Sequence, residues 1–333
     1  MTGVRTAWSL GSPSGRQGAI ALVHLRGDVD GALHALGVPR VGVGAVALRR
    51  LPGVDEMVIA RWTAASAHLM PHGGTAVLES LQRAMGRAGL REDRDAGPPD
   101  VFPEARSEAE ARMLEALASA ASPLAIDLLL DQPRRWGLPG ASPDPGLDQV
   151  LNRLLRPPLV VALGATNIGK STLCNALAAE RVSAESDEPG TTRDAVGVEL
   201  NLGGLVVHYL DAPGLREPGE GASAEREAID LAIEFARSAD LILRCGDPRT
   251  PPPELASVFG TEGVPRDSMA VCLRGDLGGA VGGDGHAGAG AGRPGEITVS
   301  VREGWGLAAL AEAIRERLVP QEALANPRAW KFW

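Results

Sequence analysis

The chain has 333 residues, of which 44% are hydrophobic, and a formal net charge of −9. This length predicts two or three domains, and the acidic balance argues against broad electrostatic binding to nucleic acid. No apolar run approaches the length of a membrane span and the first residues lack a signal peptide, so we expect a cytoplasmic protein with no membrane partner. Three widely spaced cysteines in apolar segments indicate buried thiols of a reducing compartment, not bridges or a metal site: Cys174, Cys245 and Cys272.

Residues 1–100 predict a small α+β domain. Apolar runs between turn signals indicate strands over residues 18–28, 44–50 and 56–62. Apolar residues at helical spacing indicate a helix over residues 75–90.

Residues 101–156 predict a helical linker region. Proline-rich breaks separate helical patterns over residues 109–121, 124–130 and 147–156.

Residues 157–319 predict an open α/β sheet, because strand and helix patterns alternate along them. A glycine-rich stretch at 278–295 indicates a flexible loop. Residues 320–333 form a C-terminal tail whose terminal aromatic residues either pack on the domain or anchor a partner, with packing the favoured interpretation. The expected strands are 159–163, 195–202, 205–211, 239–247, 268–277 and 296–301, and the expected helices follow the first strand and cover 224–237 and 307–318.

Residues 164–171 read GATNIGKS and fit the G-x-x-x-x-G-K-[ST] pattern of a phosphate-binding loop between a strand and a helix. Its backbone N–H groups and the helix N-terminus would surround the phosphates. Lys170, one of only two lysines in the chain, would reach the β- and γ-phosphates, and the Ser171 hydroxyl would ligate Mg²⁺. A glycine-rich turn with a chance lysine is the alternative, which the strand–loop–helix context disfavours. The predicted nucleotide-binding residues are Gly164, Asn167, Ile168, Gly169, Lys170, Ser171 and Thr172.

Two later segments follow in the order expected of a GTPase of the translation-factor-related class. Residues 190–194 read GTTRD, where Thr192 can close on Mg²⁺ and the γ-phosphate. Asp211 ends a predicted strand and can hold the Mg²⁺ shell, and Gly214 can offer its N–H to the γ-phosphate. Either motif alone is weak, since GTTRD also suits an ordinary turn and D-x-x-G is common by chance.

Together these residues resemble the tRNA-modification GTPases called MnmE or TrmE, of the TrmE–Era group. The resemblance covers residues 159–247 through GxxNxGKS, PGTTRD, DAPGLRE (where the family usually has DTAG) and SADLIL. It implies a Ras-like P-loop GTPase domain that binds GTP and GDP, hydrolyses GTP to GDP and phosphate, and serves wobble-uridine modification of tRNA.

The resemblance also implies roles for two side chains. Asn167 would help to ligate a K⁺ ion that is held when two G domains dimerise. Glu225 would orient the attacking water, although a small insertion leaves Glu220 and Glu227 as alternatives. It is an equally good interpretation that Glu225 is only an acidic side chain in the first turn of a helix, stabilised there by the helix dipole.

The segment for base recognition departs from the family pattern. Where the family has N-K-x-D, this chain has Leu273, Arg274, Gly275 and Asp276. Asp276 can still pair with the N1 and N2 hydrogens of guanine, and Arg274 can stack over the base. Leu273 cannot supply the polar contacts of asparagine, so we expect a weakened guanine preference. Ser300 matches the later S-A motif on the base side.

The N-terminal domain resembles the first domain of the family in SPSGRQGAIALVHLRG and in the His72-Gly73-Gly74 turn before a helix. The resemblance implies dimerisation and binding of a one-carbon folate. The polar segment that normally precedes H-G-G is replaced by TAASAHLMP, which argues against folate. A polar turn residue is an equally good interpretation of His72.

The architecture predicts a shortened and divergent member of this family. The helical region is short, and the chain ends without the C-I-G-K tetrapeptide whose cysteine the modification needs. The tRNA and a modification partner protein are therefore implied by resemblance alone. Two alternatives stay open: a non-catalytic nucleotide-dependent switch, and a nucleoside triphosphatase with relaxed base choice, which Leu273 favours.

Overall fold

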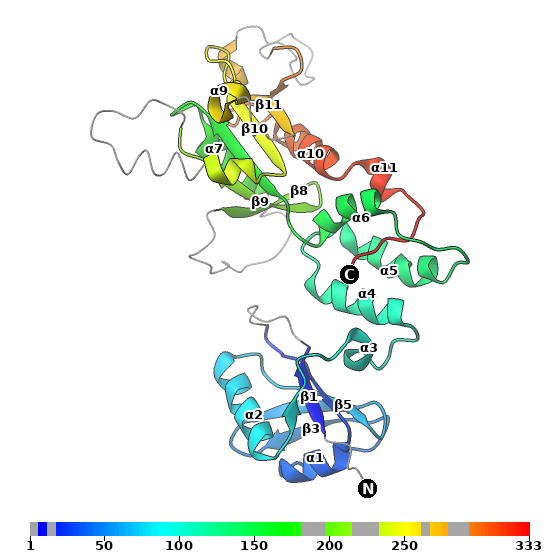
Figure 1. Ribbon diagram of the computed structural model, residues 1–333. Coiled ribbons are helices and arrows are strands. Elements are labelled where there is room, and N and C mark those ends of the chain that lie inside the picture. The colour runs from blue at the N-terminus through cyan, green and yellow to red at the C-terminus, as the bar shows by residue number, and fades with distance from the viewer. Residues whose placement is uncertain (1–5, 12–17, 181–196, 215–232, 261–266, 279–292) are drawn as a thin grey trace. The chain divides into compact units, whose positions relative to one another are not determined.

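The computed structural model describes all residues outside 1–5, 12–17, 181–196, 215–232, 261–266 and 279–292 (Figure 1). The chain divides into two compact units, which we call the N unit and the P-loop unit. The N unit comprises Met1–Ser119, Leu129–Ala141 and Trp333, and the P-loop unit comprises Ala120–Leu128 and Ser142–Phe332. No helix in these described ranges is both long and apolar enough to cross a bilayer.

The N unit is built on a six-stranded sheet in the order β3-β4-β5-β2-β1-β6, antiparallel except for the β1–β6 pair. Helices α1 and α2 pack on one face of this sheet, where Leu33 and Leu81 are buried with Leu25 and Ile59 of the strands. The elements are β1 (Ala7–Leu10), β2 (Val23–Arg26), α1 (Val29–Ala35), β3 (Val46–Leu51), β4 (Asp55–Arg61), β5 (Ser66–Met70), α2 (Thr75–Arg87) and β6 (Arg91–Glu92).

One prediction for this unit needs correction, and one helix was missed. The strand expected from residue 18 begins only at Val23, because Ile20 is 64% exposed and makes a single bridge to His72 instead of entering the sheet. Helix α1 was not predicted, although Asp28 caps it by accepting the Gly31 N–H at 2.9 Å. An N-cap aspartate before an apolar residue is the signal that could have revealed this short helix.

A helical region follows the N-terminal sheet, with α3 (Pro98–Val101), α4 (Glu108–Ser119) and α5 (Ala125–Trp136). Helix α5 continues past its predicted end at residue 130 and contains Pro133. Proline lacks the N–H that would bond the Leu129 carbonyl, so the continuation depends on packing. Leu129 and Gln132 are both fully buried, which explains why burial overrides local propensity here.

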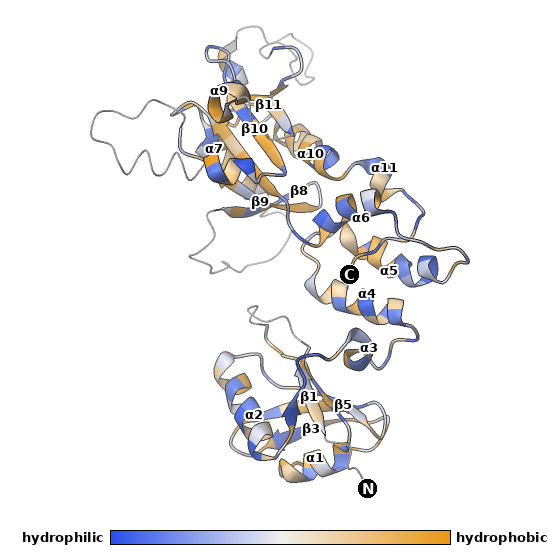
Figure 2. Cartoon of the chain, viewed as in Figure 1, coloured by the Kyte–Doolittle hydropathy of each residue, from blue (hydrophilic) through white to orange (hydrophobic). Residues whose placement is uncertain are grey.

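The P-loop unit contains a second six-stranded sheet, in the order β12-β11-β10-β7-β9-β8. Its strands are parallel except for the β8–β9 pair, and they appear largely hydrophobic in Figure 2. Such runs are typical of parallel strands covered on both faces, and this confirms the predicted α/β fold. The elements are α6 (Pro145–Leu151), η1 (Asn152–Leu154), β7 (Leu159–Gly164), α7 (Lys170–Glu180), β8 (Val198–Leu202), β9 (Leu205–Asp211), β10 (Leu241–Gly246), α9 (Leu255–Phe259), β11 (Ser268–Cys272), η3 (Gly275–Gly278), β12 (Ile297–Thr298), α10 (Leu307–Leu318) and α11 (Gln321–Leu324).

The C-terminal tail packs within the P-loop unit through residues 328–332. Trp330 is fully buried, and its indole N–H donates to Asn152 Oδ1 at 3.1 Å. The backbone N–H of Lys331 donates to Asp148 Oδ1 at 2.8 Å. Phe332 is 8% exposed. The packing interpretation of the tail is confirmed for Trp330 and Phe332.

Candidate nucleotide-binding site

The predicted phosphate loop joins β7 to α7 at the carboxyl end of a central parallel strand, the edge where open α/β sheets bind ligands. Its backbone takes left-handed conformations at Asn167 (φ 58°) and Gly169 (φ 112°). At Gly164, a Cβ would lie 2.4 Å from the Cys245 carbonyl oxygen of the neighbouring strand β10. The path of the loop therefore requires glycine at two of the positions that the pattern specifies.

Lys170 lies inside this loop with only 6% of its surface exposed. Its Nζ donates to the carbonyl oxygens of Gly164 and Ala165, both at 3.2 Å. Burial lowers the pKa of this ammonium, and the nearby Asp211 carboxylate opposes that effect. Two of the three N–H donors of this ammonium bond backbone carbonyls, so the third can bond an anion such as a phosphate oxygen.

Ser171 and Asp211, from different elements, meet beside Lys170. The Ser171 hydroxyl donates to Asp211 Oδ2, and Asp211 Oδ1 is buried with no hydrogen-bond partner among the described residues. A hydroxyl and a carboxylate with a free buried oxygen are the donors that Mg²⁺ prefers. The residues predicted to hold Mg²⁺ at this position therefore fit that ion.

Gly214 brings the D-x-x-G segment against the phosphate loop. A Cβ at this position would lie 2.4 Å from Thr166 Cα and 2.3 Å from Thr166 Oγ1. Only glycine permits this approach, so the segment after β9 and the loop after β7 form one site. Of the other predicted loop residues, Ile168 is buried and Thr172 is exposed in the first turn of α7.

The predicted base-recognition residues also come together. Ser300 is fully buried, and its hydroxyl donates to Asp276 Oδ1 at 2.8 Å. This bond orients the carboxylate that was expected to read the base. Leu273 is buried at 2% exposure, so the position of the family's asparagine is filled by an apolar side chain.

Arg274 contacts residues that the sequence did not connect to it. Its guanidinium donates to the Asn167 carbonyl oxygen and lies 3.8 Å from the carboxylate of Asp247. Asp247 was not predicted as a site residue. Its position directly after β10, at the carboxyl end of a parallel strand, is the signal that could have identified it.

Four predicted residues lie outside the described residues: Thr192, Glu225 and its alternatives Glu220 and Glu227.

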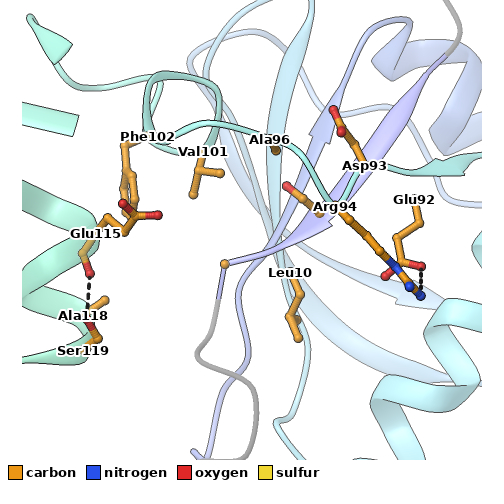
Figure 3. A pocket seen from close by; sticks show the side chains of 12 residues that line it. Leu10, Glu92, Asp93, Arg94, Ala96, Val101, Phe102, Glu115, Ala118 and Ser119 are labelled. Atoms are coloured by element: carbon orange, nitrogen blue, oxygen red, sulfur yellow. Dashed lines mark hydrogen bonds and ion pairs between the residues drawn. The ribbon is translucent and has the colours of Figure 1, made fainter. Parts of the chain in front are cut away.

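The N unit contains a pocket of about 590 Å³ lined by residues of β1, β6, α3 and α4 (Figure 3). Three carboxylates line it, from Glu92, Asp93 and Glu115, against one guanidinium, from Arg94. Arg94 pairs with Glu92 at 3.0 Å. Asp93 pairs with Arg26, so arginines neutralise two of the three carboxylates.

His72 does not line this pocket. Its side chain is 70% exposed, and Nδ1 lies 2.9 Å from Asp55 Oδ1. This geometry suits the interpretation as a polar turn residue. Within the described parts of the chain there is no group of three or more His, Cys, Asp or Glu residues placed to hold a metal. All three cysteines are buried, as their apolar segments predicted.

Comparison with known proteins decides the class of this site. Residues 159–265 match the family model described as "50S ribosome-binding GTPase". This part of the chain is a P-loop GTPase domain. It contains the phosphate loop, Asp211 and Gly214.

The curated relatives of this GTPase domain support the resemblance drawn from its motifs. The chain is 42% identical over 161 residues to the tRNA modification GTPase MnmE of Acidiphilium cryptum (strain JF-5), covering 48% of this chain and 32% of that protein. It is 38% identical over 157 residues to MnmE of Methylobacterium radiotolerans, covering 47% and 32%. The match thus spans about a third of the length of these relatives.

Solved structures of GTPases are also similar. A crystal structure of Era in complex with MgGDPNP and nucleotides 1506–1542 of 16S ribosomal RNA is 24% identical, with a TM-score of 0.37, over 48% of this chain and 56% of that chain.

Proposed function

We propose that this chain binds GTP and hydrolyses it to GDP and phosphate. The observation that carries this proposal is the meeting of Lys170, Ser171 and Asp211 at the carboxyl end of the sheet in a GTPase domain. The curated relatives, which are named GTPases, support it.

In this proposal the chain's own residues position the nucleotide and leave the phosphoryl group open to in-line attack. Lys170 and the N–H groups of the loop hold the β- and γ-phosphates, and Gly214 offers its N–H to the γ-phosphate. Glu225 orients the attacking water, with Glu220 and Glu227 as alternatives. Asp276, oriented by Ser300, pairs with guanine.

Two cations complete the proposed site. Ser171, Thr192 and Asp211 would hold Mg²⁺, and the exposed amide of Asn167 offers an oxygen suited to K⁺. When bound, these ions neutralise the charge on the phosphoryl oxygens.

One experiment tests both the reaction and the base choice: steady-state hydrolysis of GTP and of ATP, each in KCl and in NaCl. We expect GTP to be preferred and KCl to increase the rate. Lys170→Ala should abolish turnover, and alanine at Glu225, Glu220 or Glu227 identifies the residue that orients water. Nucleotide binding without turnover would favour the non-catalytic switch. Equal rates for GTP and ATP would favour the triphosphatase with relaxed base choice. Equal rates in KCl and NaCl would contradict the proposed role of Asn167 in binding K⁺.

For the biological process, we propose that the GTPase serves tRNA modification, as the names of its relatives suggest, and that it acts there with a partner protein. Expression of the chain in bacteria that lack MnmE tests this proposal, with wobble uridines of tRNA quantified by mass spectrometry. Restored modification in the wild type but not in Lys170→Ala would support it, and unmodified uridines with soluble, GTP-hydrolysing protein would contradict it.

We further propose a homodimer through the GTPase domains and the N unit. The N-unit contact is supported by an apolar row on the edge strand β3, where Val46 is 70% exposed and Leu48 is 58% exposed. Leu48 lies opposite Val58 of β4, on the face that α1 and α2 leave uncovered. An edge strand with exposed apolar side chains is a template for pairing with another chain.

We expect the double variant Val46→Glu, Leu48→Glu to shift the mass in multi-angle light scattering from dimer to monomer. The matched control is Leu138→Glu, which places the same charge at an exposed leucine of the N unit outside the β3 strand. A wild-type chain that is monomeric both without nucleotide and with a GTP analogue would contradict the homodimer.

A further inference from the structure

Two strained residues face each other in the proposed nucleotide site. Asn167 and Arg274 are the only non-glycine residues with positive φ in the described part of the chain, at 58° and 53°. They are joined directly, because Arg274 Nη2 donates to the Asn167 carbonyl oxygen. Such backbone conformations are unfavourable for residues other than glycine and persist where the surroundings enforce them.

A buried carboxylate fixes the other side of the Arg274 guanidinium. Asp247 is 6% exposed, and its Oδ1 accepts the N–H groups of Arg249 at 2.9 Å and Thr250 at 2.6 Å. These bonds hold the carboxylate in a turn after β10. The second oxygen, Oδ2, lies 3.8 Å from Arg274 Nη1. Asp247 therefore anchors the guanidinium through an oxygen that its own turn does not use.

The shape of arginine suits this position. A planar guanidinium presents several N–H groups at fixed angles, so one side chain can reach a carboxylate and a carbonyl together. The guanidinium also runs along the phosphate loop, since a Cβ built at Gly169 would lie 3.8 Å from Arg274 Nε. A lysine has a single ammonium on a flexible stem and would not span both partners in the same way.

We infer that Arg274 is a positioning residue: the chain of contacts Asp247–Arg274–Asn167 holds the phosphate loop in its nucleotide-binding conformation. This inference rests on the proposed nucleotide site and adds a role for Asp247, which lies behind Arg274. Breaking the contact at either end should weaken binding of any nucleotide through its phosphates. Base selectivity should be unchanged, because Asp276 and Ser300 form a separate contact.

The test measures dissociation constants of GDP and of inosine diphosphate, which lacks the exocyclic amine of guanine, in the full chain. Asp247→Asn keeps an oxygen for the turn but removes the charge, and Arg274→Ala removes the guanidinium. We expect each to weaken GDP binding about 10-fold, which corresponds to about 1.4 kcal/mol. The ratio of the GDP and inosine diphosphate constants should stay within twofold of wild type, and Arg274→Lys should recover part of the affinity.

A double-mutant cycle separates this role from a general loss of structure. If Asp247 acts through Arg274, the double variant Asp247→Asn, Arg274→Ala binds GDP no more weakly than Arg274→Ala alone. Arg302→Ala, at an exposed arginine of the same unit, is the control and should bind as wild type does. Additive losses, or a changed base ratio in Arg274→Ala, would overturn the inference. If wild type hydrolyses GTP while both single variants bind GDP normally, the inference alone fails; if wild type binds no nucleotide, the proposed function fails with it.

Discussion

At the scale of single residues, the site combines positions that the sequence predicts well with others that depend on the folded backbone. Lys170 and Ser171 could be assigned because the loop pattern fixes their chemistry. The contact of Arg274 with Asn167 could not, since it joins two residues that lie 107 positions apart and both adopt left-handed conformations. Asp247 could not be predicted for the same reason, because its ion-pair partner is Arg274.

Leu273 gives the first prediction at this scale. The buried isobutyl group offers no polar contact beside the base-recognition loop. We expect Leu273→Asn to raise the ratio of kcat/KM for GTP over ATP about 10-fold, because one added hydrogen-bonding group is worth about 1.4 kcal/mol in discrimination. Leu273→Ala is the control, since it removes the same apolar group and adds no polar one. An unchanged ratio in a folded Leu273→Asn variant would show that this position does not select the base.

At the scale of elements, alternation of strand and helix patterns predicted the P-loop unit well, because its parallel strands are continuous apolar runs. The N unit was harder. Its short strand β5 (SAHLM) carries a histidine inside an apolar run, and the two-residue strand β6 has no pattern of its own. Packing rather than local propensity also decided the length of α5, as Pro133 shows.

The attachment of the C-terminal tail to α6 and η1 gives a prediction for an element. Trp330 is the largest of the fully buried side chains. Trp330→Ala should lower the free energy of unfolding of the P-loop unit by about 3 to 5 kcal/mol, as expected for a large side chain removed from a core. Urea unfolding followed by circular dichroism measures this loss.

Trp330→Phe is the matched comparison, because it keeps an aromatic ring but removes the N–H that donates to Asn152. It should cost less than Trp330→Ala. Equal stability of Trp330→Ala and wild type would contradict a structural role for the tail.

At the scale of the whole molecule, the two units have separate cores and should respond differently to acid. In the N unit, His24 and His68 are buried side by side, with ring centroids 4.6 Å apart. Burial, and then the nearby His68 and Arg26, lowers the pKa of His24 from 6.5 to about 3. Burial also lowers the pKa of His68.

These shifts predict the direction of a pH effect. The unfolded chain takes up a proton at His24 near pH 6.5, whereas the folded chain does so only near pH 3. The N unit therefore has its full stability above pH 6.5 and loses on the order of 3 kcal/mol as the pH falls from about 6.5 to about 4.5. Urea unfolding between pH 7.5 and 4.5, followed by near-UV circular dichroism, checks this loss.

His24→Gln should flatten the pH dependence, because it removes the buried titrating ring. His34→Gln, at an exposed histidine of the same unit, should leave it unchanged. A wild-type stability that rises on acidification over this range would contradict the assignment.

The three buried cysteines make the chain convenient for spectroscopy. Burial raises the pKa of Cys174, that of Cys245 to about 12 and that of Cys272 to about 11. Since only the thiolate reacts with maleimides, the native thiols should stay unmodified at neutral pH. A single cysteine introduced at an exposed position would then carry a dye or spin label alone, and distances between the two units could be measured in solution without first removing any native cysteine.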